Sequence, residues 1–470
     1  MNRKSFMLTT FLMSFAILST SAGNYELSLK RKKIKPDLEN IYVEKIIDAR
    51  QNKICFGFVM DGYHDRNVPV VFDKGLELEF TNLFYESFEP REDKVPLAVK
   101  INHLFLYELK GEEGSFDAVE INMDFYMREG NSWFHEFQAA KYLLNYGNTS
   151  SGKFENMLEN LIEKCFNEYG HRMKNGWGYH RKVNETEMNG NGSGPYLSRI
   201  ALSQQRTTSL YHTYNDFRDN IADTLTPFRV LDHRQFEGCK ILREPYNNQK
   251  ITDVWGFHYH DTLFVNIANS YSPAIQTGDQ LIIENPPILT DQSGAATGAV
   301  IGGLTFGLVG GLVGGLIGSA TDGPEQSDLE YTVDFTTGLP VPLETPDYRK
   351  YKATLVFYTD KFKSDEHSIQ LFAGGDHICI FPQESYLIID VYPENIPVEI
   401  CLKSDVDEYC ENFEAEIFNT TYIELLIDKK GRVEIFPKQS GHTATSLQRL
   451  IEEGKLKRIE GNFSLQKPSP

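Results

Sequence analysis

The 470-residue sequence has few cysteines and lacks the short motifs of common catalytic and metal sites. Its six cysteines are widely spaced without a CxxC pair, which excludes the usual zinc and redox signatures. His135-Glu136 does not continue to the second histidine of HExxH, because Ala139 occupies that position. Ser193 is not in a GxSxG elbow, because Asn191 replaces the first glycine. We expect no enzyme activity and no cofactor or metal; a hydrolase with dispersed catalytic residues is the alternative.

Positive charge is also scarce. The chain has 47 Lys and Arg against 66 Asp and Glu, a formal net charge of −19. Nucleic-acid binding needs basic faces that displace counterions, so this class of function is excluded. Charged residues at 24% and hydrophobic residues at 40% indicate a globular protein, and the length allows several domains.

The N-terminus predicts export. Residues 1–22 resemble a signal peptide, with Arg3 and Lys4 before a short apolar core and small residues ahead of Gly23. The apolar run is too short for a comfortable membrane span, and no cysteine follows it for lipoprotein processing. We therefore expect a periplasmic or outer-membrane-associated protein.

Residues 294–320 are free of charge and rich in glycine. On a helix their four-residue steps would place small residues on one stripe, the pattern by which apolar helices pack closely. The glycines expected to mediate helix packing or membrane contact are Gly298, Gly302, Gly303, Gly307, Gly310, Gly311, Gly314, Gly315 and Gly318. The stretch resembles the glycine-zipper segments of bacterial envelope proteins.

Three interpretations of this stretch stay open: membrane association, a pair of packed helices broken near Gly310-Gly311, and a glycine-rich insertion in a soluble protein. Residues 299–317 would form a helix of roughly 28 Å, close to a bilayer core. Acidic residues flank the stretch, and no Lys or Arg follows until Arg349, so no positive anchor fixes a single span. These flanks favour a packed hairpin at a membrane surface or between subunits.

Residues 40–172 predict a first domain with the order β-α-β-β-β-α, an α/β sandwich. The run 116–128 alternates cleanly, with apolar Val119 and Ile121 on one face and Glu120 and Asn122 on the other. Residues 73–88 and 152–169 have helical spacing. The pattern resembles small envelope lipoprotein and ABC-transport auxiliary domains, which bind partners or lipids without doing chemistry.

Residues 173–195 have linker composition and predict a domain boundary, and residues 196–290 predict a small α+β domain. A β-hairpin is expected there, with its turn at His260-Asp261. Trp255, His258 and Tyr259 form a candidate ligand platform, which keeps open a glycan- or lipid-binding function. His258, His260 and Asp261 make an incomplete metal set. Residues 210–340 resemble exported proteins of Bacteroidota whose function is unknown.

Residues 325–458 predict a β-sandwich that ends in a helix at 445–453, closed by Gly454. Cys401 and Cys410 are close enough to form a disulfide across a hairpin, although buried free thiols are the alternative for the cysteines as a set. The late strand beginning Thr421-Tyr422 before a helix resembles a small DUF2846-like envelope β-sandwich family of unknown function.

The sequence thus predicts an α+β multidomain, exported cell-envelope protein with a structural, binding or assembly role. Its expected partners are another envelope protein, a membrane surface or a second copy of the chain. The glycine-rich segment is the element expected to contact them.

Overall fold

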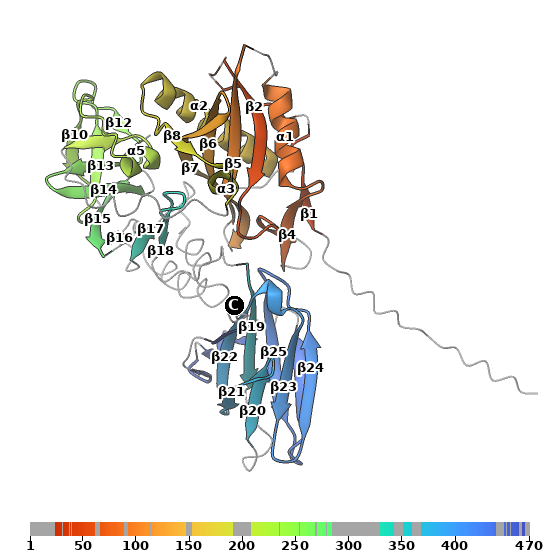
Figure 1. Ribbon diagram of the computed structural model, residues 1–470. Helices are drawn as coiled ribbons and strands as arrows, with labels where there is room; N and C mark the ends of the chain where they lie inside the picture. Colours follow the sequence, from red (N-terminus) through yellow and green to blue (C-terminus); the bar gives the residue numbers. More distant parts are fainter. Residues whose placement is uncertain are drawn as a thin grey trace, which may run out of the picture.

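The computed structural model is a β-rich protein with several sheets, consistent with the multidomain part of the predicted α+β multidomain fold (Figure 1). The predicted signal peptide, residues 1–22, and the glycine-rich segment 294–320 lie outside the described residues. The structure describes residues 24–465 except 31, 37, 39, 62–65, 89–92, 112–113, 147–152, 191–207, 235, 253, 268–269, 279, 284–329, 343–350, 360–367, 439–445, 448, 452 and 460–462.

The first sheet runs in the order β1-β4-β3-β5-β6-β7-β8, and β2 pairs with the other half of the long β5. Strands β5, β6 and β7 are joined by hairpins and form its centre. The strands are β1 Tyr25–Leu27, β2 Ile41–Asp48, β3 Gly57–Asp61, β4 Arg66–Phe72, β5 Val95–Gly111, β6 Gly114–Glu129, β7 Ser132–Tyr146 and β8 Arg181–Val183.

Two helices, α1 (Leu76–Ser87) and α2 (Lys153–Lys174), cover one face of this sheet. Their apolar residues recur at three- and four-residue steps, so each helix presents one apolar stripe. The strand residues that meet them are the apolar members of each alternation, such as Val119 and Ile121 in β6. Burial of this face forms the largest apolar cluster in the described part of the chain.

Residues 173–190 are not a linker, which corrects the interpretation from composition. Strand β8 pairs with the start of β7, and the short helix α3 (Glu185–Asn189) follows it. The Asn184 side chain caps α3, and Met188 is buried against the first sheet. The polar composition indicated a linker, although a strand at a sheet edge and a one-turn helix also need few apolar residues.

The second sheet runs β18-β17-β16-β15-β14-β13-β9, and β10, β11 and β12 join it through β15. The predicted hairpin is confirmed as β13 and β14, with His260 and Asp261 both at positive φ, the pattern of a type I′ turn. A short helix, α5 (Tyr214–Arg218), packs on it. The strands are β9 Ser209–Tyr211, β10 Arg229–Asp232, β11 Lys240–Arg243, β12 Lys250–Ile251, β13 Gly256–Tyr259, β14 Thr262–Ile267, β15 Ser270–Thr277, β16 Gln280–Ile283, β17 Tyr331–Val333 and β18 Pro340–Pro342.

The second sheet continues after the glycine-rich segment, which corrects the predicted boundary at residue 325. Ile283 at the end of β16 is the antiparallel partner of Tyr331 at the start of β17 (Figure 1). Residues 331–342 therefore belong with residues 209–283 rather than with the C-terminal strands. A pairing across such a sequence distance has no local signature.

The C-terminal strands form two sheets around one apolar core, which we call the C-terminal sandwich. One sheet runs β26-β25-β19-β22-β27 with β28 also on β22, and the other runs β21-β20-β23-β24. The strands are β19 Ala353–Thr359, β20 Ile369–Ala373, β21 Asp376–Phe381, β22 Ser385–Val391, β23 Val398–Lys403, β24 Glu408–Phe413, β25 Thr420–Ile427, β26 Val433–Lys438, β27 Lys457–Arg458 and β28 Phe463–Leu465; a 3₁₀ turn, Pro393–Asn395, follows β22.

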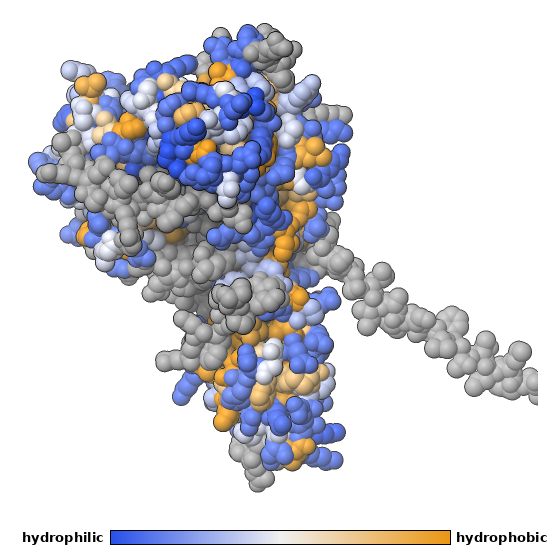
Figure 2. Space-filling model, in the orientation of Figure 1, coloured by the Kyte–Doolittle hydropathy of each residue, from blue (hydrophilic) through white to orange (hydrophobic). Residues whose placement is uncertain are grey.

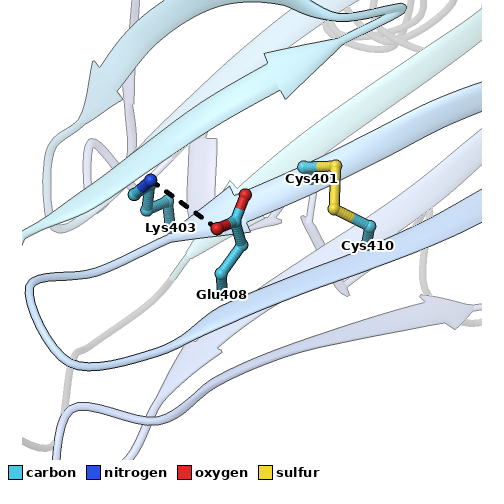
Figure 3. The surroundings of a disulfide bond; sticks show 4 residues. All are labelled: Cys401, Lys403, Glu408 and Cys410. Atoms are coloured by element: carbon cyan, nitrogen blue, oxygen red, sulfur yellow. Dashed lines mark ion pairs between the residues drawn. A yellow bond between two sulfur atoms is a disulfide. The ribbon is translucent and has the colours of Figure 1, made fainter.

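Cys401 and Cys410 form a disulfide, as the sequence allowed. The two residues are direct cross-strand partners in the β23–β24 hairpin, and the Lys403–Glu408 ion pair lies beside them (Figure 3). Cys55, Cys165 and Cys379 are free thiols, and the Sγ of Cys239 lies 3.5 Å from the hydroxyl oxygen of Ser272. Residues 446, 447 and 449–451 are helical and Gly454 follows at φ 65°, in agreement with the expected closing helix and its glycine end.

Candidate functional site

The predicted ligand platform is not assembled, because Trp255 is part of the core. Its side chain is 8% exposed, and its ring packs 4.9 Å from that of Phe217. The indole Nε1 donates a hydrogen bond to the carbonyl of Gly338, 3.0 Å away. Trp255 therefore holds α5 and the β17–β18 turn on the second sheet and offers no exposed ring to a ligand.

His258 and Tyr259 are half-buried neighbours in β13 and therefore point to opposite faces of the sheet. His258 lies across from Leu263, and Tyr259 packs on the cluster that contains Phe257. His260 follows in the turn. Within the described residues, no group of three or more His, Cys, Asp and Glu is placed to hold a metal.

The nine glycines named above lie outside the described residues. What the structure describes is where the chain leaves and re-enters the sheet around them. Because Ile282 pairs with Thr332 and Ile283 with Tyr331, residues 284–330 begin and end at adjacent strand ends. None of the helices in the described ranges has both the length and the apolar character needed to cross a bilayer.

Sequence reasoning missed a polar cluster on the second face of the first sheet. Asp124, 3% exposed, lies at its centre. Its carboxylate accepts hydrogen bonds from Asn102 Nδ2 at 2.9 Å and from Gln138 Nε2 at 3.1 Å, and it lies 3.1 Å from Nε2 of His135. Burial alone would raise the pKa of Asp124, but the contact with His135 and the other donors outweigh it and hold the pKa below its usual value.

This polar face is closed by another part of the chain rather than open to solvent. Asn122 Nδ2 donates a hydrogen bond to the carbonyl of Thr336 at 2.8 Å, from the turn between β17 and β18. Beside it, His103 Nε2 lies 3.0 Å from Glu120, whose side chain is fully buried. The alternation in β6 could have indicated these acids, but only the packed second sheet explains their burial.

A second buried polar group joins α2 and β7 of the first sheet to α5 of the second; we call it the ionic junction. Its charged members are Lys141, Glu168, Arg172, Asp216, Arg218 and Asp219. Arg172, only 1% exposed, contacts Asp219 at 2.8 Å and Asp216 at 3.1 Å. Positive and negative groups balance, as buried charges require.

The ionic junction also protects an open strand edge. Beyond β8, the β7 backbone meets side chains of α5. Asn215 accepts a hydrogen bond from the N–H of Ala140 and donates one to its carbonyl, at 3.1 and 3.3 Å. Arg218 donates to the carbonyl of Gln138. The α5 side chains thus occupy the place of a neighbouring strand and satisfy backbone groups that would otherwise be unpaired.

A third contact joins the first sheet to the C-terminal sandwich; we call it the aromatic junction. Phe418 packs on Phe58 at a ring distance of 4.9 Å, and Tyr351 lies 5.4 Å from Phe418. Asn419 continues the β4 edge: its Oδ1 accepts from the N–H of Asn67, and its Nδ2 donates to the carbonyl of Asn67, both at 2.7 Å. In the view of Figure 2, hydrophobic residues gather along this border and over the sandwich.

The free thiols with a shifted pKa are all held in the protonated form. Burial raises the pKa of Cys55 and Cys379 to about 11 and that of Cys165 to about 12, so these thiols stay protonated at neutral pH. At the ionic junction, Glu168 and Asp219 contact cations, and Asp216 also accepts a hydrogen bond from the N–H of Thr213. Comparisons with known protein families, with curated proteins and with solved structures find no match for this chain.

Proposed function

We propose that the chain is an exported, non-enzymatic envelope protein that presents residues 294–320 to a membrane surface, an envelope protein or a second copy. The main observation behind this proposal is that β16 and β17, which flank this segment, are hydrogen-bonded neighbours. The sheet holds Ile283 and Tyr331, which flank the part of the chain that contains this segment, side by side. This arrangement supports an out-and-back excursion of the segment from the sheet.

The same strand pair argues against a single membrane crossing. One crossing would place β16 and β17 on opposite sides of the bilayer, and their ladder would then be lost. An even number of crossings, a shallow insertion or a packed helical pair keeps both ends on one side. A helical pair with glycines at the contact lets two backbones approach closely.

Two further observations support export. The Cys401–Cys410 disulfide is typical of an oxidising compartment outside the cytoplasm. The N-terminal 22 residues have the charge and apolar pattern of a signal peptide. We assign the chain to the periplasm or the outer-membrane surface on these grounds.

We also infer that the elements of residues 41–174 form an α/β sandwich of the kind found in small envelope lipoprotein domains. Helices α1 and α2 on one face of the β5–β6–β7 meander support this. For residues 353–465, the two sheets around one core support a DUF2846-like module. The first type of module is expected to bind partners or lipids.

The test is fractionation of cells that produce the wild type or a variant in which residues 294–320 are replaced by a short Gly-Ser linker. Since Ile283 and Tyr331 are adjacent, a short linker can span the gap without straining the sheet. We expect the wild type in the membrane fraction or in a higher oligomer, and the variant as a soluble, folded monomer.

A second variant, Gly310→Leu with Gly314→Leu, keeps the apolarity but fills the glycine stripe. It should bind membranes and lose self-association if the glycines mediate packing. A wild type that is fully soluble and monomeric would overturn the proposal.

A further inference from the structure

The outer face of strands β10, β11 and β12 carries a row of cations. Arg229 of β10 is the cross-strand partner of Arg243 of β11, and Arg243 is the partner of Lys250 of β12. Residues at this register point to one face of the sheet. The opposite face holds Val230 and Leu242, which pack into the core. The ribbon is therefore amphipathic, with its charged side turned outward.

These cations have no acidic partner in the described part of the chain. No ion pair joins Arg229, Arg243 or Lys250 to a carboxylate there, and the Arg243 guanidinium donates only to the carbonyl of Asn248. The nearby Asp232 is engaged by Lys240 and is 85% exposed. Like charges directly across a ladder destabilise a sheet, so the arrangement works against the strand pairing.

Two members of the row, Arg243 and Lys250, line a hollow with a volume of 740 Å³. Leu231 and Ile241 contribute apolar surface between the charged residues. The residues that line the hollow are Leu231, Asp232, His233, Arg234, Ile241, Arg243, Asn248 and Lys250. The volume is in the range of small-ligand sites, which typically measure roughly 300–1,000 Å³.

The electrostatics of the hollow agree with this geometry. Burial, and then the charge of Arg243, lowers the pKa of Lys250. Burial, and then the charge of Lys250, lowers the pKa of His233. Both groups thus lie in a positive field, although the whole chain carries a net charge of −19. At physiological salt the Debye length is about 8 Å, so the distant acidic residues are screened from a ligand here.

We propose that this hollow binds a phosphate group, with Arg243 and Lys250 as its main cationic contacts and Leu231 and Ile241 against the apolar part of the ligand. An arginine fork matches two oxygens of a phosphate, and the lysine adds a point charge. The phosphate belongs either to a small soluble phosphomonoester or to the headgroup of a phosphorylated lipid. The proposal is independent of residues 294–320.

The experiment uses the full mature chain, titrated calorimetrically with inorganic phosphate and sn-glycerol 3-phosphate. Vesicle co-sedimentation compares phosphatidylcholine with and without phosphatidic acid. We expect binding to glycerol 3-phosphate, to the phosphatidic acid vesicles, or to both, weakening as salt rises. Soluble binding alone identifies a metabolite source, and vesicle binding alone identifies a lipid source.

Arg243→Gln with Lys250→Gln should weaken this binding at least tenfold and leave the melting temperature unchanged or raised, since it removes repulsion between like charges. Lys430→Gln with Arg432→Gln takes the same charge from another hairpin and should leave binding unchanged. Arg243→Lys keeps the charge and should still weaken binding, because it loses the fork. Replacement of residues 294–320 should not affect binding of glycerol 3-phosphate.

The proposal is overturned if none of the probes binds. It is also overturned if the double variant of Arg243 and Lys250 binds as the wild type does, or if the Lys430 and Arg432 control loses binding equally.

Discussion

The first sheet makes two junctions of opposite chemical character. Toward the second sheet it uses buried ions, with Arg172 between Asp216 and Asp219. Toward the C-terminal sandwich it uses aromatic rings around Phe418 and the amide of Asn419. A buried ion network demands one geometry, because an unpaired charge is strongly unfavourable. An aromatic contact tolerates small shifts, so we expect the first and second sheets to move as one body and the sandwich to be more loosely held.

The largest expected effect comes from the ionic junction. Arg172→Ala removes the arginine partner of Asp216 and leaves Asp219 with Arg218 as its remaining cation, and we expect it to destabilise the two-sheet body by about 3–5 kcal/mol. Urea denaturation followed by tryptophan fluorescence measures it, since Trp255 lies in this body. Arg449→Ala removes an exposed helical ion pair and serves as control, with a change within about 0.5 kcal/mol. An equally small effect of Arg172→Ala would show that the junction is not a rigid link.

Removal of the disulfide tests the stability of the C-terminal sandwich independently of both junctions. Cys401→Ser with Cys410→Ser should lower the stability of the sandwich by about 2–3 kcal/mol, the loop entropy of a short closed ring. We expect calorimetry to show a shift of one transition only, because both cysteines lie within the β23–β24 hairpin of the sandwich. A shift of every transition would mean that the sandwich and the first sheet unfold as one unit.

A smaller effect is expected at the aromatic junction. Phe418 is half-buried and has a φ of 65°, so its truncation loses ring contacts while its backbone conformation stays strained. Phe418→Ala should cost about 1–2 kcal/mol, the scale for a partly buried aromatic ring. Limited proteolysis should then release the sandwich sooner, and Phe436→Ala, an exposed ring in the same sandwich, should not change the pattern. Unchanged release in Phe418→Ala would contradict the assignment of this contact.

The smallest effect distinguishes the junctions by pH. Burial would raise the pKa of Glu168, but Lys141 and then Arg172 outweigh it and lower the pKa below its usual value. A group with a depressed folded pKa contributes stability above its unfolded value, and that stability is lost as pH falls through the folded pKa. We therefore expect the urea midpoint of the two-sheet body to fall below about pH 4.5.

Asp216 contributes to the pH dependence of stability with the opposite sign to Glu168, because burial and then the charge of Glu168 raise the pKa of Asp216. Glu168→Gln should therefore reduce the acid-dependent loss, whereas Phe418→Ala should leave the pH profile unchanged. A steeper acid loss in Glu168→Gln would contradict the assignment.

Local elements were predictable where one physical pattern dominated. The helical spacing of 73–88, the alternation of 116–128 and the turn at His260-Asp261 all correspond to observed elements. Strand β15 was not predicted, because Pro273 interrupts its strand pattern. In the structure Pro273 is nevertheless the cross-strand partner of Phe264 in β14. Strands β10 to β12 were missed because they are short and largely polar on one face.

The site was less predictable than the fold. Trp255 was expected on a surface and lies in the core, since an aromatic residue beside a hairpin has the same sequence signature in either place. The ionic junction joins residues of β7, α2 and α5 that are far apart in the chain. The row of cations depends on strand register, which places Arg229, Arg243 and Lys250 together.

The sequence by itself determined the acidic balance, the signal-peptide-like pattern of residues 1–22, the apolar glycine repeat and the short spacing of Cys401 and Cys410, because each depends on composition or on neighbours in the chain. Tertiary structure decided that residues 283 and 331 are neighbours and that Arg181–Val183, in a polar stretch, join a sheet. It also decided which charges are buried in pairs and which cations line up on one face of β10, β11 and β12. Pairing between distant strands depends on the free energy of the whole packed core, and no local pattern encodes it.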